Sequence, residues 1–119
     1  MHGSSEAHTR LVEDVLIAIG GLTFVRCWKQ HSGAARAFDD PNRVISFGLT
    51  GSGDISGILL GGYRLEIECK TGDAVQSKEQ KNFEKMIKKM GGYYFVVRNK
   101  DEAIEHILKV AAVHGRAGE

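Results

Sequence analysis

A β-hairpin is the strongest structural signal in the 119-residue sequence. Two runs rich in β-branched and aromatic residues, Ile55–Leu60 and Tyr63–Thr71, stand on either side of Gly61 and Gly62. A Gly-Gly pair between two such runs is typical of a tight turn between antiparallel strands. The centre of the fold is therefore predicted to be a β-sheet that contains this hairpin.

Helices are predicted on both sides of the hairpin. Apolar residues recur at helical spacing up to Ile19, where Gly20 and Gly21 follow. A second helix is predicted to begin at Ser77, which stands in capping-box spacing with Gln80. The other predicted elements are a flexible start over 1–5, strands over 22–28, 44–49 and 93–98, a loop over 29–43, and a helix over 101–113. This order predicts one α/β domain over residues 1–119, with a central mixed sheet flanked by helices.

The composition is that of an ordinary globular protein, with 42% hydrophobic and 26% charged residues. No apolar run approaches the length of a membrane span and no signal-peptide pattern opens the sequence, so we expect a cytoplasmic protein without a membrane partner. Cys27 and Cys69 lie far apart and form no Cys-x-x-Cys pair. This argues against a structural zinc site and against a disulfide-stapled scaffold.

Charge is distributed unevenly along the chain. The total of 16 Lys and Arg against 15 Asp and Glu gives a net charge of only +1. Residues 70–100, however, contain eight basic and three acidic residues, a local net charge of +5. Such a region favours a polyanionic partner, and a solvated lysine-rich helix face is the alternative interpretation.

The second strand of the hairpin carries an unusual set of charges. Alternation places Glu66, Glu68 and Lys70 on one face of a strand that we expect to be central. Buried charges are costly unless they are paired or bind a metal. The alternative is a ladder of ion pairs on a solvent-facing edge strand. Asp54 followed by Glu68 and Lys70 would suit phosphodiester hydrolysis, because carboxylates are hard oxygen ligands for Mg²⁺ or Mn²⁺ and a lysine orients water or stabilises negative charge.

Three motifs carry a resemblance to a known family. They are Gly53-Asp54-Ile55, Glu68-Cys69-Lys70 and Ser77-Lys78-Glu79-Gln80. In this order they resemble the PD-(D/E)XK nuclease superfamily, and more narrowly the VRR-NUC (virus-type replication-repair nuclease) domain of stand-alone phage and bacterial members. The resemblance covers nearly the whole chain and implies a restriction-endonuclease-like core. The chain departs from the family pattern at Gly53, where a proline usually precedes the aspartate.

The resemblance implies a role for each matching residue. Asp54 and Glu68 would bind a catalytic Mg²⁺ or Mn²⁺ through their side chains, and Cys69 would contribute its main-chain carbonyl. Lys70 would be the catalytic lysine. Gln80 matches a glutamine of the family at the start of the helix after the Glu-x-Lys strand, although the capping box alone would also explain it.

The family also has a glutamate in its first helix. Glu6 fits the order of features best and Glu13 is the other candidate, while a solvated helix face would explain both. His8 projects to the apolar side of the same helix, where a half-buried histidine with a satisfied hydrogen bond is favoured over a metal ligand.

The expected function is that of a metal-dependent, structure-selective DNA endonuclease. By resemblance the enzyme would be a homodimer that resolves four-way (Holliday) junctions in a bacterial or phage-infected cell. The alternatives are a flap or restriction-type nuclease of the same superfamily, and a nucleic-acid-binding module without catalysis. The residues expected to contact DNA phosphates are Lys78, Lys81, Lys85, Lys88 and Arg36.

The hairpin register decides whether the two carboxylates can share a metal. A two-residue turn would place Asp54 opposite Cys69, on the wrong face of the sheet for Glu68. A shift of one residue reverses every side chain. The chemistry therefore predicts a three- or five-residue loop, a β-bulge between residues 54 and 60, or Asp54 ahead of the paired ladder.

Overall fold

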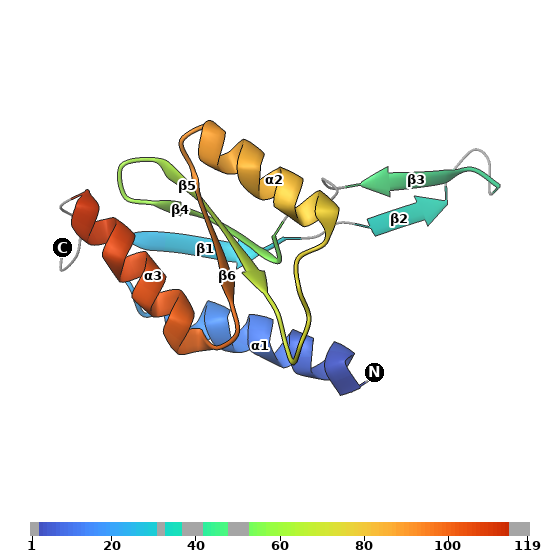
Figure 1. Ribbon diagram of the computed structural model, residues 1–119, viewed down its shortest axis with the longest axis horizontal. Coiled ribbons are helices and arrows are strands. Elements are labelled where there is room, and N and C mark those ends of the chain that lie inside the picture. The colour runs from blue at the N-terminus through green and yellow to red at the C-terminus, as the bar shows by residue number, and fades with distance from the viewer. Residues whose placement is uncertain (1–2, 31–32, 37–41, 48–52, 115–119) are drawn as a thin grey trace.

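The computed structural model describes residues 3–30, 33–36, 42–47 and 53–114 of the chain. Four strands form a sheet in the order β1-β4-β5-β6 (Figure 1). They are β1 (Val25–Lys29), β4 (Ile55–Leu59), β5 (Tyr63–Cys69) and β6 (Tyr93–Val97). The β1–β4 and β4–β5 pairs are antiparallel, and the β5–β6 pair is parallel. The prediction of an α/β fold with a central mixed sheet is confirmed.

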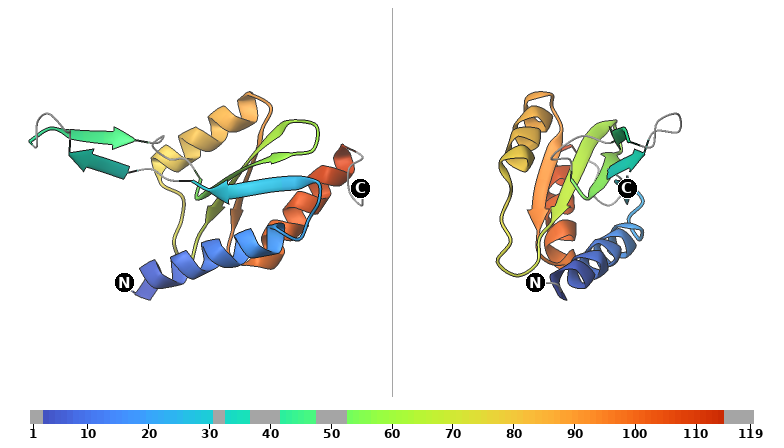
Figure 2. Two further views of the ribbon diagram at one scale, coloured as in Figure 1. Left: turned by 180° about the vertical axis from the view of Figure 1, so that it is seen from behind. Right: turned by 90° about the vertical axis from the view of Figure 1, so that its right-hand side faces the viewer.

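Helices cover both faces of this sheet (Figure 2). Helices α1 (Gly3–Ile19) and α3 (Lys100–Val113) lie on one face, where they enclose the larger hydrophobic core. Helix α2 (Lys78–Lys89) lies on the other face, where Phe83 and Ile87 pack on Tyr94 of β6. Within the described ranges, no helix is both long and apolar enough to cross a membrane.

The β4–β5 hairpin has a three-residue loop. Leu59 pairs with Tyr63, so residues 60–62 form the connection, and Gly61 and Gly62 adopt φ angles of 103° and 90°. Positive φ is readily accessible to glycine because it has no Cβ. The loop length is one of those predicted from the chemistry. Ile55 pairs with Ile67, and continuation of this register beyond the ladder places Asp54 opposite Glu68.

Strand β5 is an interior strand between β4 and β6. The side chains of Glu66 and Glu68 are both fully buried, with a relative exposure of 0%. The alternative of an ion-pair ladder on a solvent-facing edge strand is therefore excluded. These two carboxylates face α2, whereas Cys69 lies in the core on the side of α1 and α3.

One sequence prediction about local structure was wrong. The region predicted as a loop over 29–43 contains strand β2 (Gly33–Arg36), which pairs antiparallel with β3 (Val44–Phe47) in a separate two-stranded sheet. Small residues give β2 little strand propensity of its own, but the backbone of the apolar strand β3 needs a partner. Helix α1 begins at Gly3, so it includes residues 3–5 of the segment that the sequence placed before the helix.

Candidate active site

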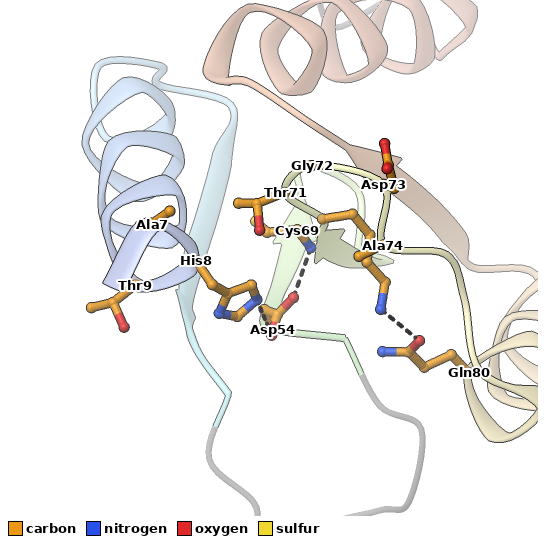
Figure 3. Close-up of a pocket in the computed structure, with 11 residues that line it drawn as sticks. Ala7, His8, Thr9, Asp54, Cys69, Thr71, Gly72, Asp73, Ala74 and Gln80 are labelled. Atoms are coloured by element: carbon orange, nitrogen blue, oxygen red, sulfur yellow. Dashed lines mark hydrogen bonds and ion pairs between the residues drawn. The ribbon is translucent and has the colours of Figure 1, made fainter. Parts of the chain in front are cut away.

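A pocket of about 760 Å³ opens where β5 ends, between α1 and the start of α2 (Figure 3). The sequence-predicted residues Asp54, Cys69, Lys70 and Gln80 all line it. The remaining lining residues come from α1 and from the segment after β5; they are Ala7, His8, Thr9, Thr71, Gly72, Asp73 and Ala74. The structure therefore brings together residues that lie up to 26 positions apart in the sequence motif.

Asp54 is held from two sides. Its Oδ2 accepts a hydrogen bond from the main-chain N–H of Cys69 at 2.7 Å, and its Oδ1 lies 3.2 Å from His8 Nε2 (Figure 3). The first contact fixes the carboxylate against β5, and the second joins it to α1. Asp54 thus has a defined position at the mouth of the pocket although it precedes β4 by one residue.

The approach to Asp54 is fixed by the second buried glutamate. Gly53 N–H donates to Glu66 Oε1 at 3.2 Å, and a Cβ at Gly53 would lie 2.8 Å from the carbonyl oxygen of Ile67. The chain can therefore approach β5 this closely only without a side chain at position 53. Glu66 Oε2 accepts hydrogen bonds from the Ser56 hydroxyl at 2.8 Å and from the Arg64 guanidinium. A fully paired Glu66 therefore has a structural role beside the site.

The two oxygens of Glu68 have different environments. Oε1 accepts hydrogen bonds from the Tyr94 hydroxyl at 2.5 Å and from Gln76 Nε2 at 3.1 Å. Oε2 lies 3.3 Å from Lys70 Nζ as an ion pair and, among the described residues, has no hydrogen-bond partner. Burial, together with the adjacent Glu68 carboxylate, raises the pKa of Tyr94 above its usual value, so this hydroxyl stays a donor.

Gln80 makes the capping-box hydrogen bonds and also contacts Lys70, while a catalytic role for it stays a prediction. Its side-chain Oε1 accepts from Ser77 N–H at 2.8 Å, while Ser77 Oγ accepts from Gln80 N–H at 3.1 Å, so the capping box is confirmed. The same Oε1 also accepts from Lys70 Nζ at 2.9 Å. Lys70, the residue that follows β5, is therefore held between Glu68 of β5 and the first turn of α2.

Helix α1 reaches the site through a residue that the sequence did not favour. Glu6 and Glu13 are both exposed, and neither lines the pocket, so a role for either stays a prediction. His8 is half-buried and contacts Asp54. Its place on the apolar side of the helix was the signal that it faces the sheet, and the prediction of a satisfied, half-buried histidine agrees with this contact.

Two of the predicted metal ligands offer carboxylate oxygens, although only Asp54 lines the pocket and the side chain of Glu68 is fully buried beside Lys70. The Asp54 and Glu68 carboxylates come from opposing positions of the hairpin, and Glu68 offers one buried oxygen without a hydrogen bond. Mg²⁺ is typically held by one or two carboxylates and keeps waters or substrate phosphates as its other ligands. Across the described ranges, no group of three or more His, Cys, Asp or Glu side chains is arranged to hold a metal ion. With waters or substrate phosphates as the other ligands, the Asp54 and Glu68 carboxylates would give an open two-carboxylate site and not an all-protein cage.

A row of lysines lies on α2 next to the pocket. The lysines predicted to contact DNA are all exposed; they are Lys78, Lys81, Lys85 and Lys88. Lys88 Nζ lies 2.7 Å from Glu84 Oε2. Partial burial would raise the pKa of Glu84, but the hydrogen bonds from Lys88 and Gln76 outweigh it and hold this pKa below its usual range. The side chain of Arg36 lies outside the described residues.

Both cysteines are predicted to react slowly in the folded protein. Burial, followed by the charge of nearby carboxylates, raises the pKa of Cys27 and of Cys69 from 9.0 to about 12. A shift of this size lowers the thiolate fraction at pH 8 by about a thousandfold. We expect both thiols to resist a disulfide reagent in buffer at pH 8 and to react promptly in urea. Since ionisation favours the unfolded chain, their contribution to stability declines as the pH rises from about 9 towards 12. Rapid labelling of the native protein would contradict this assignment.

Four of the predicted site residues line the pocket: Asp54, Cys69, Lys70 and Gln80. Glu68 does not line it but contacts Lys70, and Glu6 does not line it. Comparisons of the chain with protein-family models, with curated proteins and with solved structures found no match.

Proposed function

We propose that the protein is a metal-dependent, structure-selective DNA endonuclease with a PD-(D/E)XK core of the VRR-NUC type. One observation carries the proposal. Lys70 Nζ lies 3.3 Å from Glu68 Oε2 and 2.9 Å from Gln80 Oε1, in an open pocket that Asp54 also lines. A lysine between a buried carboxylate and an open pocket is suited to hydrolysis of a phosphodiester. The resemblance of the three motifs to this superfamily also supports the proposed endonuclease function.

The residues divide the chemistry among them. Asp54, Glu68 and the main-chain carbonyl of Cys69 would hold Mg²⁺ or Mn²⁺. When bound, such an ion polarises the scissile phosphate and lowers the pKa of a coordinated water. Lys70 donates hydrogen bonds toward the attacking water or toward the growing negative charge of the phosphate. Gln80 keeps the Lys70 ammonium directed at the pocket.

DNA binding is assigned to the lysines of α2. Their side chains are exposed on the helix that begins at the pocket, so the phosphates near the cut would lie within their reach. Contacts to phosphates position a duplex but read no sequence. This supports selection by DNA structure. A four-way junction cut by a homodimer, with each subunit cutting one strand, follows from the resemblance.

The deciding experiment compares DNA substrates of one sequence. A four-way junction, a flap and a linear duplex are incubated with the protein and Mg²⁺ or Mn²⁺, with a chelator as control, and the mass of the protein in solution is measured alongside. We expect metal-dependent cuts in the junction and a dimer mass. Preferred cutting of the flap or of the linear duplex would favour the alternative nuclease. Binding without any cut would favour a nucleic-acid-binding module.

The lysine row gives a separate prediction about binding. Each phosphate contact to duplex DNA contributes about 0.9 to the slope of log affinity against log salt. Replacing Lys81, Lys85 and Lys88 together by glutamine should reduce that slope by roughly two to three. Fluorescence anisotropy over a range of salt concentrations measures it, and Lys109→Gln on α3 is the control. An unchanged slope would mean that this face of α2 is only solvated.

A further inference from the structure

We propose that Tyr94 and Gln76 are positioning residues, which fix Glu68 in the orientation required of a metal ligand. This inference rests on the proposed function and adds to it two side chains outside the motif. Neither residue lines the pocket. They lie on β6 and on the segment between β5 and α2, and both reach the same oxygen of Glu68.

The two oxygens of the Glu68 carboxylate have different partners. Oε1 receives both hydrogen bonds, at 2.5 Å from Tyr94 and at 3.1 Å from Gln76. Oε2 has the ion pair with Lys70 but no hydrogen bond from any described residue. Two donors on one oxygen fix the rotation of the carboxyl group and leave the lone pairs of the other oxygen available. Among the described residues, Lys70 is the one recorded partner of this buried oxygen, so Oε2 is the atom that Glu68 would offer to a bound metal ion.

Both donors are themselves held in place. The Tyr94 ring is 3% exposed and makes an edge-to-face contact with Phe83 of α2, with ring centroids 6.3 Å apart. The Gln76 amide donates a second hydrogen bond, to Glu84 Oε1 at 2.9 Å. The orientation of Glu68 is therefore tied to the docking of α2 on the sheet. When a hydrogen-bond partner of a metal-binding carboxylate is removed, the metal affinity typically falls by 10–100-fold.

Tyr94→Phe is the most direct test, because it removes one hydroxyl and keeps the ring against Phe83. Mn²⁺ is titrated into the full-length protein by calorimetry. We expect an affinity about 10–100-fold weaker than that of the wild type. Tyr93→Phe is a matched control: Tyr93 is the neighbouring residue of β6, and its hydroxyl contacts His114 at 2.6 Å on the other face of the sheet. This control should bind Mn²⁺ as the wild type does.

A second measurement separates positioning from a general loss of structure. In the cleavage assay, Tyr94→Phe should need a 10–100-fold higher Mn²⁺ concentration for half-maximal rate, and excess Mn²⁺ should restore the rate. Its affinity for the junction should stay that of the wild type. Gln76→Leu removes the other donor from a half-buried position and should shift the Mn²⁺ requirement in the same direction, whether or not Tyr94→Phe folds.

The outcomes are distinguishable. If wild type binds Mn²⁺ and both variants bind it equally well, the inference is overturned while the proposed function stands. A rate loss that excess Mn²⁺ does not restore would also overturn it. If wild type neither binds Mn²⁺ nor cuts DNA, the proposed function fails, and the inference fails with it.

Discussion

Replacing Lys70 by alanine should lower the rate of DNA cleavage by roughly 10²–10³-fold or more and leave DNA affinity nearly unchanged. The ammonium group of Lys70 lies 3.3 Å from Glu68 Oε2 and 2.9 Å from Gln80 Oε1, and alanine removes it. Loss of a preorganised donor at a charge that develops in the transition state typically costs this much. DNA affinity is spread over many lysines, so one of them is a small part of it. Single-turnover cleavage and anisotropy on one junction measure the two quantities.

Lys109→Ala on α3 is the matched control for this variant. Lys109 is exposed and does not line the pocket, so the same change of residue type should leave the rate unaltered. Full activity of Lys70→Ala would remove Lys70 from the mechanism. Equal losses in both variants would show that overall charge, and not position, determines the rate.

Replacing Asp54 by asparagine should abolish cleavage and weaken Mn²⁺ binding by more than the roughly 100-fold that the loss of an outer-shell partner costs. The charge and one ligand oxygen are lost together. The fold should persist, because the amide oxygen of asparagine can still accept the hydrogen bond from Cys69 N–H that Asp54 Oδ2 accepts. Calorimetry with Mn²⁺, the cleavage assay and a thermal unfolding curve report these three properties.

Asp73→Asn provides the comparison within the same pocket. Asp73 also lines it and is exposed, but it follows β5 and has no place in the motif. We expect this variant to bind Mn²⁺ and to cut DNA as the wild type does. A larger loss at Asp73 than at Asp54 would move the metal site to the segment after β5 and would end the assignment given above.

The parts of the fold that the sequence predicted are those with local signals. Alternation on β5 located Glu66 and Glu68 on one face, and the capping box located the start of α2. The proposed chemistry also limited the length of the hairpin loop, because Asp54 and Glu68 share a face of the sheet only in some registers. Strand β2 was missed because it pairs with β3 through a tertiary contact, and its small residues have little strand propensity of their own.

The candidate site was predictable only in its motif residues. Tyr94 and Gln76 lie 26 and 8 positions from Glu68, and neither has a spacing that relates it to a carboxylate. Their contacts depend on how β6 and α2 pack, which no local pattern encodes. The place of His8 on the apolar side of α1 indicated that it faces the sheet. Its contact with Asp54, however, depends on how that helix lies against the sheet.

The double use of Gln80 Oε1 links two events that are usually independent. The terminal turn of a helix is among the first parts of a protein to open by local unfolding, at little cost in free energy. In this chain the atom that closes the first turn of α2 also accepts the hydrogen bond from Lys70. Each time that turn frays and Gln80 moves, Lys70 loses this hydrogen-bond acceptor. The opening of the helix start and the order of the pocket are therefore coupled through one atom.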